Sequence, residues 1–179
     1  RLQNLNLHFD DSGTVKVTDL RSKCRNLKQE EKLDLIVVDY LQLLSGSAHN
    51  QANRTQEVSE ISRVLKETAR ELKVPVIALS QLSRNVENRK EKEPIMADLR
   101  ESGSIEQDAD IIVFLYREDY YDDESTRKNV VDLTIAKNRS GTIGKFELLF
   151  NRNMSTFSNP STSSFGSTSD EESQLRDGY

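Results

Sequence analysis

One carboxylate stands out because of the residues that precede it. Asp39 ends the apolar run "LIVVD" at 35–39, and apolar residues resume almost at once in "YLQLL". An acid there is costly unless it is exposed or bound to something. In an open parallel sheet ligands bind beyond the carboxyl ends of the strands, and an apolar strand ending in aspartate is a known way to hold Mg²⁺ beside nucleotide phosphates. A helix cap or a solvated acid at a strand end explains the segment equally well.

A second polar group occupies the equivalent place after the next apolar run. Ser80 and Gln81 follow "VPVIAL" at 74–79. A neutral amide at a strand end can sense a γ-phosphate or orient a water molecule by hydrogen bonding. An exposed polar pair without a role is the commoner explanation of Ser-Gln alone. An acid and an amide at neighbouring strand ends nevertheless strengthen the functional interpretation of both.

Two further segments carry cations. In "DLRESGSIEQDAD", 98–110, Gly103 lets the backbone approach a ligand, and Arg100 beside free N–H groups suits nucleic-acid phosphates. A helix-capping turn is the simpler interpretation of that composition. Lys137 and Arg139 are two residues apart, so on a strand they point the same way. Such a pair can stabilise charge on a phosphate, although cations more often protect an edge strand from pairing.

Bulk properties exclude other kinds of site. His8 and His49 have no Cys or acidic partner at metal-ligand spacing, so the sequence predicts neither a metal cage nor a Ser/His/Asp triad. Cys24 is the only cysteine, which rules out a disulfide within the chain. The net charge is −5, so any contact with DNA must be local. No apolar run approaches the roughly 20 residues needed to cross a membrane, and no membrane partner is expected.

The elements that must position these groups alternate between apolar runs and helical patterns. The apolar runs are 33–39, 74–80 and 110–116. Between the runs, 55–73 has the clearest helical period and 18–32 a weaker one. This order predicts an α/β fold, a mostly parallel sheet with helices on both faces, and a closing antiparallel hairpin over 129–137 and 143–150. The continuous apolar composition of the three runs is typical of strands that are buried on both faces.

The end of the chain has a different composition. Eleven of the 25 residues in 155–179 are Ser or Thr, and few are apolar. Such a segment cannot bury enough surface to offset its ordering entropy. The sequence therefore predicts a globular part, 1–154, and a disordered Ser/Thr-rich tail, 155–179.

Taken together, these segments resemble the carboxy-terminal, RecA-like motor domain of the DnaB family of replicative DNA helicases. The resemblance covers roughly residues 3 to 157, and "DLRESGSIEQDAD" is its most specific motif. It implies a RecA-like fold and an ATP-dependent DNA helicase that unwinds duplex DNA at the replication fork. The matching segments are "DLRSKCRNLK", "LDLIVVDYLQLL", "NRTQEVSEISRVLKETARELKVPVIALSQLSR", "DLRESGSIEQDADIIVFLYR" and "AKNRSGTIGKFELLFN".

The resemblance implies nucleotide-binding roles for four residues, with ATP and Mg²⁺ as cofactors. Asp39 matches the Walker B aspartate that organises Mg²⁺ at the ATP phosphates. Gln81 matches the glutamine that contacts the γ-phosphate and relays hydrolysis to the DNA loops. Lys137 and Arg139 match the hairpin pair that reaches into the neighbouring subunit's ATP, where arginine fingers contribute roughly 10³–10⁵ in rate.

The resemblance also implies a DNA site and partners. Arg100, Glu101 and Gly103 match a loop that lines the central channel and follows single-stranded DNA. The family works as a homo-hexamer, and primase and a helicase loader are expected partners of the complete protein. A ring that encircles one strand grips the backbone with a few loops and needs no basic overall charge. A bacterial cytoplasm or a plastid stroma is the expected compartment.

One departure from the family is large. The family's Walker A loop, G-x-x-x-x-G-K-[ST], cradles the ATP phosphates. None of the seven glycines, at 13, 46, 103, 141, 144, 166 and 178, begins this pattern. The loop, the family's catalytic glutamate and its amino-terminal domain are missing, so the chain matches the later part of a motor domain and is expected to be inactive alone. The Ser/Thr-rich tail also lies outside the family pattern.

Two other functions stay open at the level of sequence. The chain could be a non-enzymatic module that binds single strands or joins a helicase ring as a passive subunit. It could also belong to another RecA-type ATPase, such as a recombinase, although "DLRESGSIEQDAD" argues against this.

Overall fold

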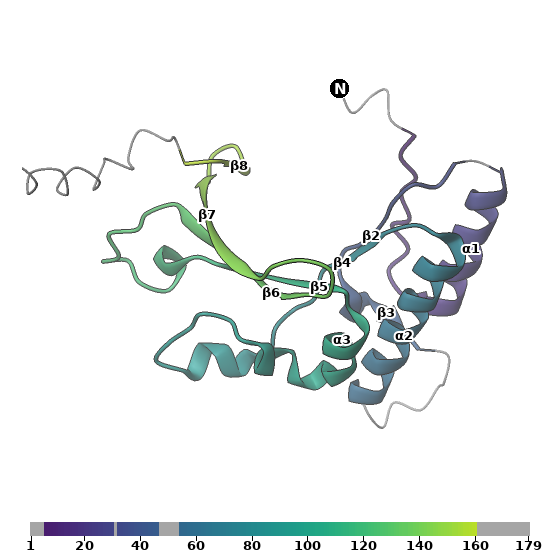
Figure 1. Cartoon of the computed structure of the whole chain (residues 1–179), viewed down its shortest axis with the longest axis horizontal. Coiled ribbons are helices and arrows are strands. Elements are labelled where there is room, and N and C mark those ends of the chain that lie inside the picture. The colour runs from purple at the N-terminus through teal and green to yellow at the C-terminus, as the bar shows by residue number, and fades with distance from the viewer. Residues whose placement is uncertain (1–5, 31, 47–53, 161–179) are drawn as a thin grey trace, which may run out of the picture. The chain divides into compact units, whose positions relative to one another are not determined.

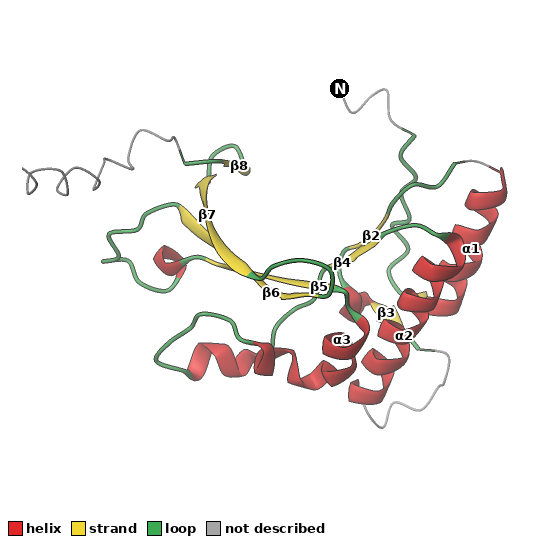
Figure 2. Ribbon diagram, viewed as in Figure 1, coloured by secondary structure: helices red, strands yellow, loops and turns green. Residues whose placement is uncertain are grey.

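The structure is a computed structural model that describes residues 6–30, 32–46 and 54–160, apart from the side chains of 100–103. The chain divides into two compact units, Arg1–Phe114 with Ile135–Ile143, and Leu115–Thr134 with Gly144–Tyr179. Figures 1 and 2 show the elements. The helices are α1 (Val17–Glu30), α2 (Arg54–Leu72) and α3 (Gly103–Asp108), with the 3₁₀ helices η2 (Leu41–Leu43), η3 (Arg84–Asn88), η4 (Met96–Ser102) and η5 (Glu118–Tyr120). The strands are β1 (Val15–Lys16), β2 (Ile36–Val38), β3 (Leu44–Ser45), β4 (Val76–Ala78), β5 (Ile111–Tyr116), β6 (Val130–Asn138), β7 (Gly144–Asn151) and β8 (Thr156–Ser158).

Parallel pairing of β2 with β4 brings two strand ends together. Val38 is in register with Ala78. Beyond the last pair, the Leu79 N–H donates to the Val38 carbonyl at 2.9 Å, and the Leu41 N–H donates to the Leu79 carbonyl at 2.8 Å. The prediction of parallel strands separated by a helical crossover is confirmed, because α2 lies between β2 and β4 in the sequence. β1 and β3 form a second parallel pair.

The helices α1 and α2 cover one face of β2 (Figure 1). α2 buries Ile61 and Leu65, which are one helical turn apart, and α1 contributes Val17 and Cys24 to the same core. Ile61 is fully buried, with 0% of its surface exposed. Burial of such side chains stabilises the layer by about 1.5–3 kcal/mol each. Both helices begin and end within a few residues of the predicted ranges.

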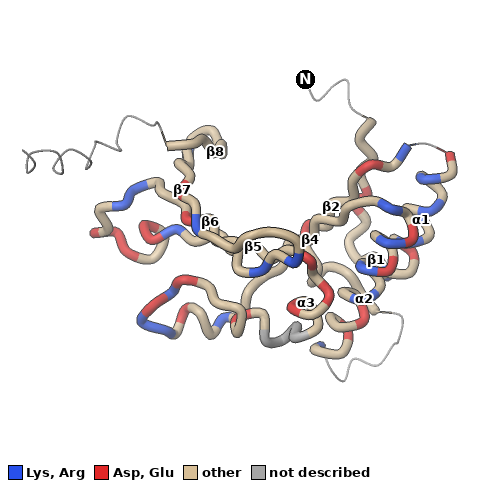
Figure 3. The backbone as a smooth tube through the Cα atoms, viewed as in Figure 1, with Lys and Arg blue, Asp and Glu red and all other residues tan. Residues whose placement is uncertain are grey.

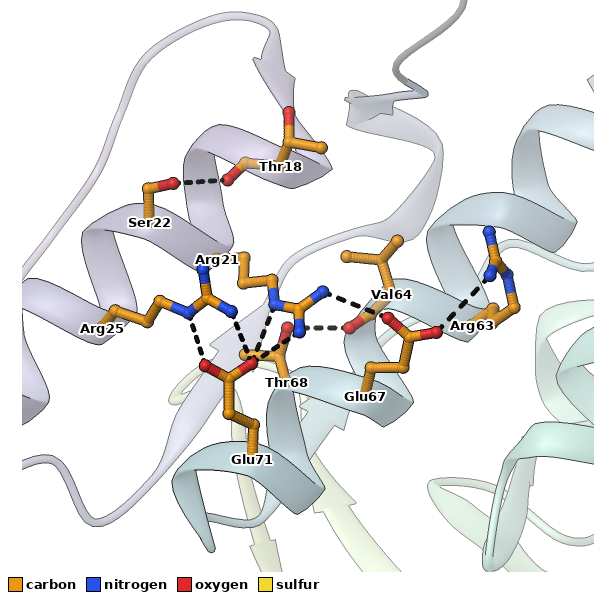
Figure 4. Close-up of polar contacts among 9 residues, drawn as sticks. All are labelled: Thr18, Arg21, Ser22, Arg25, Arg63, Val64, Glu67, Thr68 and Glu71. Atoms are coloured by element: carbon orange, nitrogen blue, oxygen red, sulfur yellow. Dashed lines mark hydrogen bonds and ion pairs between the residues drawn. The ribbon is translucent and has the colours of Figure 1, made fainter.

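Ion pairs add polar contacts between α1 and α2 (Figure 4). Arg21 and Arg25 on α1 both bind the Glu71 carboxylate on α2, at 2.6 Å and 2.5 Å. Arg21 also binds Glu67, which accepts from Arg63 one turn away on the same helix. These hydrogen bonds lower the pKa of Glu71 to about 2, with Arg25 the largest cause. Lys, Arg, Asp and Glu recur along both helices (Figure 3), and the pairs orient two helices that the apolar core already holds.

The other face of the strands was predicted to be buried as well, and the described residues do not bury it. Val37 on β2 is 58% exposed and Ile77 on β4 is 54% exposed, whereas Ile36 and Val38 are buried. β5 shows the same alternation, with Ile112 and Phe114 buried between exposed neighbours. The predicted α/β fold with parallel strands, flanking helices and a closing antiparallel hairpin is confirmed, and among the described residues α1 and α2 both pack on the same core.

The four-stranded sheet has the order β5-β6-β7-β8. The predicted hairpin ranges match β6 and β7, which are neighbours in this sheet. β8 is a correction to the predicted tail, because Thr156–Ser158 pairs antiparallel with β7. Phe157 lies opposite Phe150, with ring centroids 5.0 Å apart. Pairing with β7 and the contact of Phe157 with Phe150 therefore give structure to 156–158, whose composition alone indicated disorder, while 161–179 lies outside the described residues.

The second unit is organised around two buried carboxylates. Asp119 accepts from the Asn129 N–H at 2.9 Å and pairs with Arg117 and Arg152. Burial raises the pKa of Asp119, but these partners outweigh it and the net pKa is lowered. Asp132 pairs with Arg127 at 2.7 Å, which lowers its pKa. None of the described helices is long and apolar enough to span a bilayer.

Candidate functional site

Asp39 lies immediately after the last residue of β2, in an exposed position, and the Asp39–Tyr40 peptide bond is cis. The position agrees with the sequence analysis, which placed the acid at the carboxyl end of a parallel strand. Among the described residues its carboxylate has no hydrogen-bond or ion-pair partner, unlike Glu71 or Asp119. An exposed carboxylate at this edge can therefore bind a cation without first giving up a partner from the described chain.

Gln42 connects this edge to the neighbouring strand end. Its side-chain amide donates to the Ser80 hydroxyl at 3.2 Å and to the Gln81 carbonyl at 3.1 Å, and its oxygen accepts from the Gln81 N–H at 3.2 Å. The backbone of Gln81 is thus fixed by one side chain on η2. Gln42 was not predicted as a site residue, although it is a single amide inside the apolar segment "YLQLL".

Asp98 connects the segment after Gln81 to residues 99–103, which include Arg100 and Gly103. The Ser83 N–H donates to the Asp98 carbonyl at 3.1 Å. The Asp98 carboxylate is buried and accepts from Arg89 at 2.7 Å and from the Ile95 N–H at 2.8 Å. Removing the Arg89 partner would leave a buried charge unpaired, which is costly. The polar stretch between β4 and α3 is therefore folded back on itself and contains η3 and η4.

The predicted DNA-binding residues lie at the junction of two helices. Arg100 and Glu101 are in η4, and Gly103 is the first residue of α3. Their side chains lie outside the described residues. The backbone is anchored on either side, because Leu99 is buried beside β5 and Ile105 packs on the α1–α2 core. The junction is thus held at both ends by apolar contacts.

Lys137 and Arg139 both contact the carboxyl end of α3. The Lys137 ammonium donates to the Glu106 carbonyl and the Arg139 guanidinium to the Gln107 carbonyl, each at 2.5 Å. Cations are favoured there by the carbonyl groups that a helix leaves unpaired at its end. The prediction that the two cations point the same way stands, because their targets are consecutive residues.

Asp110 completes this cluster. Its carbonyl accepts from the Arg139 N–H at 2.9 Å, and its carboxylate lies 3.5 Å from the Arg139 guanidinium. The second carboxylate oxygen binds Lys66 of α2. The hydrogen bond from Lys66 is the largest cause of a lowered pKa at Asp110. Asp110 was not predicted as a site residue, although it directly precedes the apolar run 111–115, just as Asp39 directly follows one.

The structure thus brings Asp39 and Gln81 to adjacent strand ends. It also brings Lys137 and Arg139, the cation pair, to α3, the helix that begins at Gly103. The Asp39 position fits Mg²⁺, because this ion usually takes one or two protein carboxylates and completes its octahedron with phosphate oxygens and water. Among the described residues no group of three or more His, Cys, Asp or Glu could hold a metal ion.

Parallel strands with a helical layer define the class as an α/β domain, and its polar residues lie at the strand ends, where such domains bind their ligands. Residues 1–159 match the family model of the DnaB-like helicase C-terminal domain. The chain belongs to this family.

Individual relatives agree with this assignment. The chain is 57% identical over 158 residues to the "Replicative DNA helicase DnaB" of Geobacillus stearothermophilus, which covers 88% of the chain. A solved structure described as an ATPase domain superposes with a TM-score of 0.84 at 48% identity, covering 89% of the chain and 56% of that protein. A DnaB-like replicative helicase, described with its interactions with primase, gives 0.83 at 48% identity and covers 89% and 39%. The chain spans 35% of the length of the Geobacillus relative.

Proposed function

We propose that the chain is the later part of the motor domain of a replicative DNA helicase, one that hydrolyses ATP, moves along single-stranded DNA as a homo-hexameric ring and unwinds duplex DNA at the replication fork. The observation that carries this proposal is the family match over residues 1–159 together with Asp39 and Gln81 at adjacent parallel strand ends. A bacterial cytoplasm or a plastid stroma is the proposed compartment.

ATP and Mg²⁺ are the proposed cofactors, and Asp39 is the residue that would hold the metal. Bound Mg²⁺ neutralises charge on the β- and γ-phosphates. Gln81 is proposed to contact the γ-phosphate, and its backbone is kept in place by the hydrogen bonds of Gln42. The phosphate-cradling loop would come from the part of the relatives that the chain does not span.

Lys137 and Arg139 are proposed to act on the nucleotide of the neighbouring subunit, and Arg100, Glu101 and Gly103 to follow the backbone of single-stranded DNA. Support for both assignments comes from their positions: the cations contact one end of α3, and Gly103 begins the other. Primase is a proposed partner, since one related structure is described with its primase interactions. A helicase loader is proposed from the family resemblance alone.

The test is a chimera in which residues 1–159 replace the matching segment of the Geobacillus relative. The chimera should hydrolyse ATP and be stimulated by single-stranded DNA. Asp39→Asn should lower the rate by at least about 100-fold, because a metal ion contributes several kcal/mol to charge stabilisation. Asp34→Asn is the matched control, since Asp34 is exposed at the opposite end of β2. Equal rates for Asp39→Asn and the parent would remove the metal role.

Mixed rings test the sharing of sites. Arg139→Ala should lower ATP hydrolysis by roughly 10³-fold or more while nucleotide binding persists. Mixing with Asp39→Asn subunits should recover activity, because one chain supplies the nucleotide site and the other the guanidinium. Failure to recover would exclude action between subunits. Arg100→Ala should weaken binding of a single-stranded oligonucleotide and leave nucleotide binding unchanged.

A further inference from the structure

Asp110 has contacts that the proposed roles of its neighbours do not require. Its carboxylate lies between a lysine of α2 and the guanidinium of Arg139, and its carbonyl accepts the Arg139 N–H. The Lys66 side chain is only 24% exposed, so neighbouring residues restrict the position of the ammonium that pairs with Asp110. The carboxylate is therefore fixed on one side and faces the cation pair on the other.

The guanidinium of Arg139 is oriented at two of its nitrogens. Nη1 lies 3.5 Å from the Asp110 carboxylate, and Nη2 donates to the Gln107 carbonyl at 2.5 Å. A planar guanidinium bound at two points keeps one orientation and presents its remaining donors in a fixed direction. The Lys137 ammonium donates to the carbonyl of the residue that precedes Gln107, Glu106.

We propose that Asp110 is a positioning residue for the cation pair, and that together with Lys66 it sets the direction in which Arg139 presents its donors. The proposal rests on the proposed function, since it concerns the residues that act on a neighbouring nucleotide. Lys66 fixes the carboxylate, the carboxylate orients the guanidinium, and the guanidinium stabilises charge only if it is held before the transition state forms.

The same contacts connect the cation pair to the DNA-binding junction. α3 has six residues, which makes it about 9 Å long. Gly103 begins this helix, and the cations bind its last carbonyls. A change in the position of the cations therefore acts on an element that also carries the DNA contact.

The experiment places Asp110→Asn on either of two chains in mixed rings of the chimera. One chain carries Asp39→Asn and supplies only the cation pair, and the other carries Arg139→Ala and supplies the nucleotide site. With Asp110→Asn on the cation-supplying chain, we expect kcat for ATP hydrolysis to fall about two- to fivefold, the range that exposed ion pairs contribute. KM for ATP should stay unchanged. With the substitution on the site-supplying chain, kcat should stay at the value of the unsubstituted mixture.

Each chain serves as the control for the other, because Asp110→Asn removes the charge pair with Lys66 in both chains and the charge pair with Arg139 only in the cation-supplying chain. Equal losses in the two mixtures would show a structural role only, and no loss in either would show that Arg139 needs no orientation by Asp110; both results overturn the proposal. Asp110→Glu on the cation-supplying chain should restore part of kcat. An inactive parent chimera, or no recovery on mixing the two parent chains, would instead contradict the proposed function.

Discussion

The α1–α2 face and the strand-end edge belong to the same unit but use their charged and polar groups differently. On the α1–α2 face, Arg21 and Arg25 are paired with Glu71 within the chain. At the strand-end edge the Asp39 carboxylate has no partner among the described residues, and the Gln42 amide is used to hold the backbone of Gln81. Internal pairing orients helices, whereas an unpaired exposed carboxylate keeps its charge available for a ligand.

The largest effect is expected from a substitution in the core beneath α1 and α2, which should lower stability far more than a substitution near the strand ends. Ile61→Ala on α2 removes a fully buried side chain and should lower the free energy of unfolding by about 2–5 kcal/mol. The same change at Ile77 on β4, which is 54% exposed, should cost less than about 1 kcal/mol. Urea unfolding of residues 1–159 measures both values. Similar losses would show that the exposed face of β4 is covered by contacts that the described residues do not make.

Gln42→Leu tests whether the strand-end edge can be disturbed without loss of stability. Two donated hydrogen bonds and one accepted bond connect Gln42 to the Ser80–Gln81 segment. Each such bond contributes about 0.5–1.5 kcal/mol, so kcat of the chimera should fall about three- to tenfold. Gln56→Leu, at an exposed position of α2, is the control and should leave kcat unchanged. A fall in the unfolding temperature with unchanged kcat would contradict a role in holding Gln81.

The ion pairs of α1 and α2 should give the smallest effect, and one that depends on pH. The pKa of Glu71 is about 2 in the folded chain, below its ordinary value of 4.5. A carboxylate with a lowered pKa stabilises the fold above its unfolded pKa, and this contribution disappears as pH falls through the folded value. The stability difference between the parent and Glu71→Gln should therefore be largest near neutral pH and shrink between 4.5 and about 2.

Thermal unfolding over this pH range measures the effect. Glu30→Gln removes an exposed carboxylate at the end of α1 and controls for the change in net charge. A difference between the parent and Glu71→Gln that grows on acidification would reverse the assigned direction of the pKa shift.

Local patterns predicted the elements that Asp39 and Gln81 require. The apolar period of 55–73 found α2, and the runs before Asp39 and Gln81 found β2 and β4, because each pattern is complete within one segment. Which face of the sheet α1 and α2 cover was not predictable in this way. Apolar composition shows that a face avoids water, and it does not show which element covers that face.

Contacts between distant residues were also missed. Gln42 binds a segment 39 residues away, and Lys66 reaches Asp110 across 44 residues. A single sequence carries no signal for such pairs, since each residue type is common at exposed positions. β8 was missed for a related reason, because the pairing of Phe157 with Phe150 depends on where β7 ends.

Cys24 gives α1 a chemical property that its ion pairs do not. It is the only thiol in the sequence and is 5% exposed within the core beneath α1. Burial raises the pKa of the Cys24 thiol. Alkylating reagents attack the thiolate and need access to it, so the folded chain protects this group in two ways. Modification of Cys24 therefore requires that the core around α1 opens. The rate of alkylation at this residue reports how often that opening occurs.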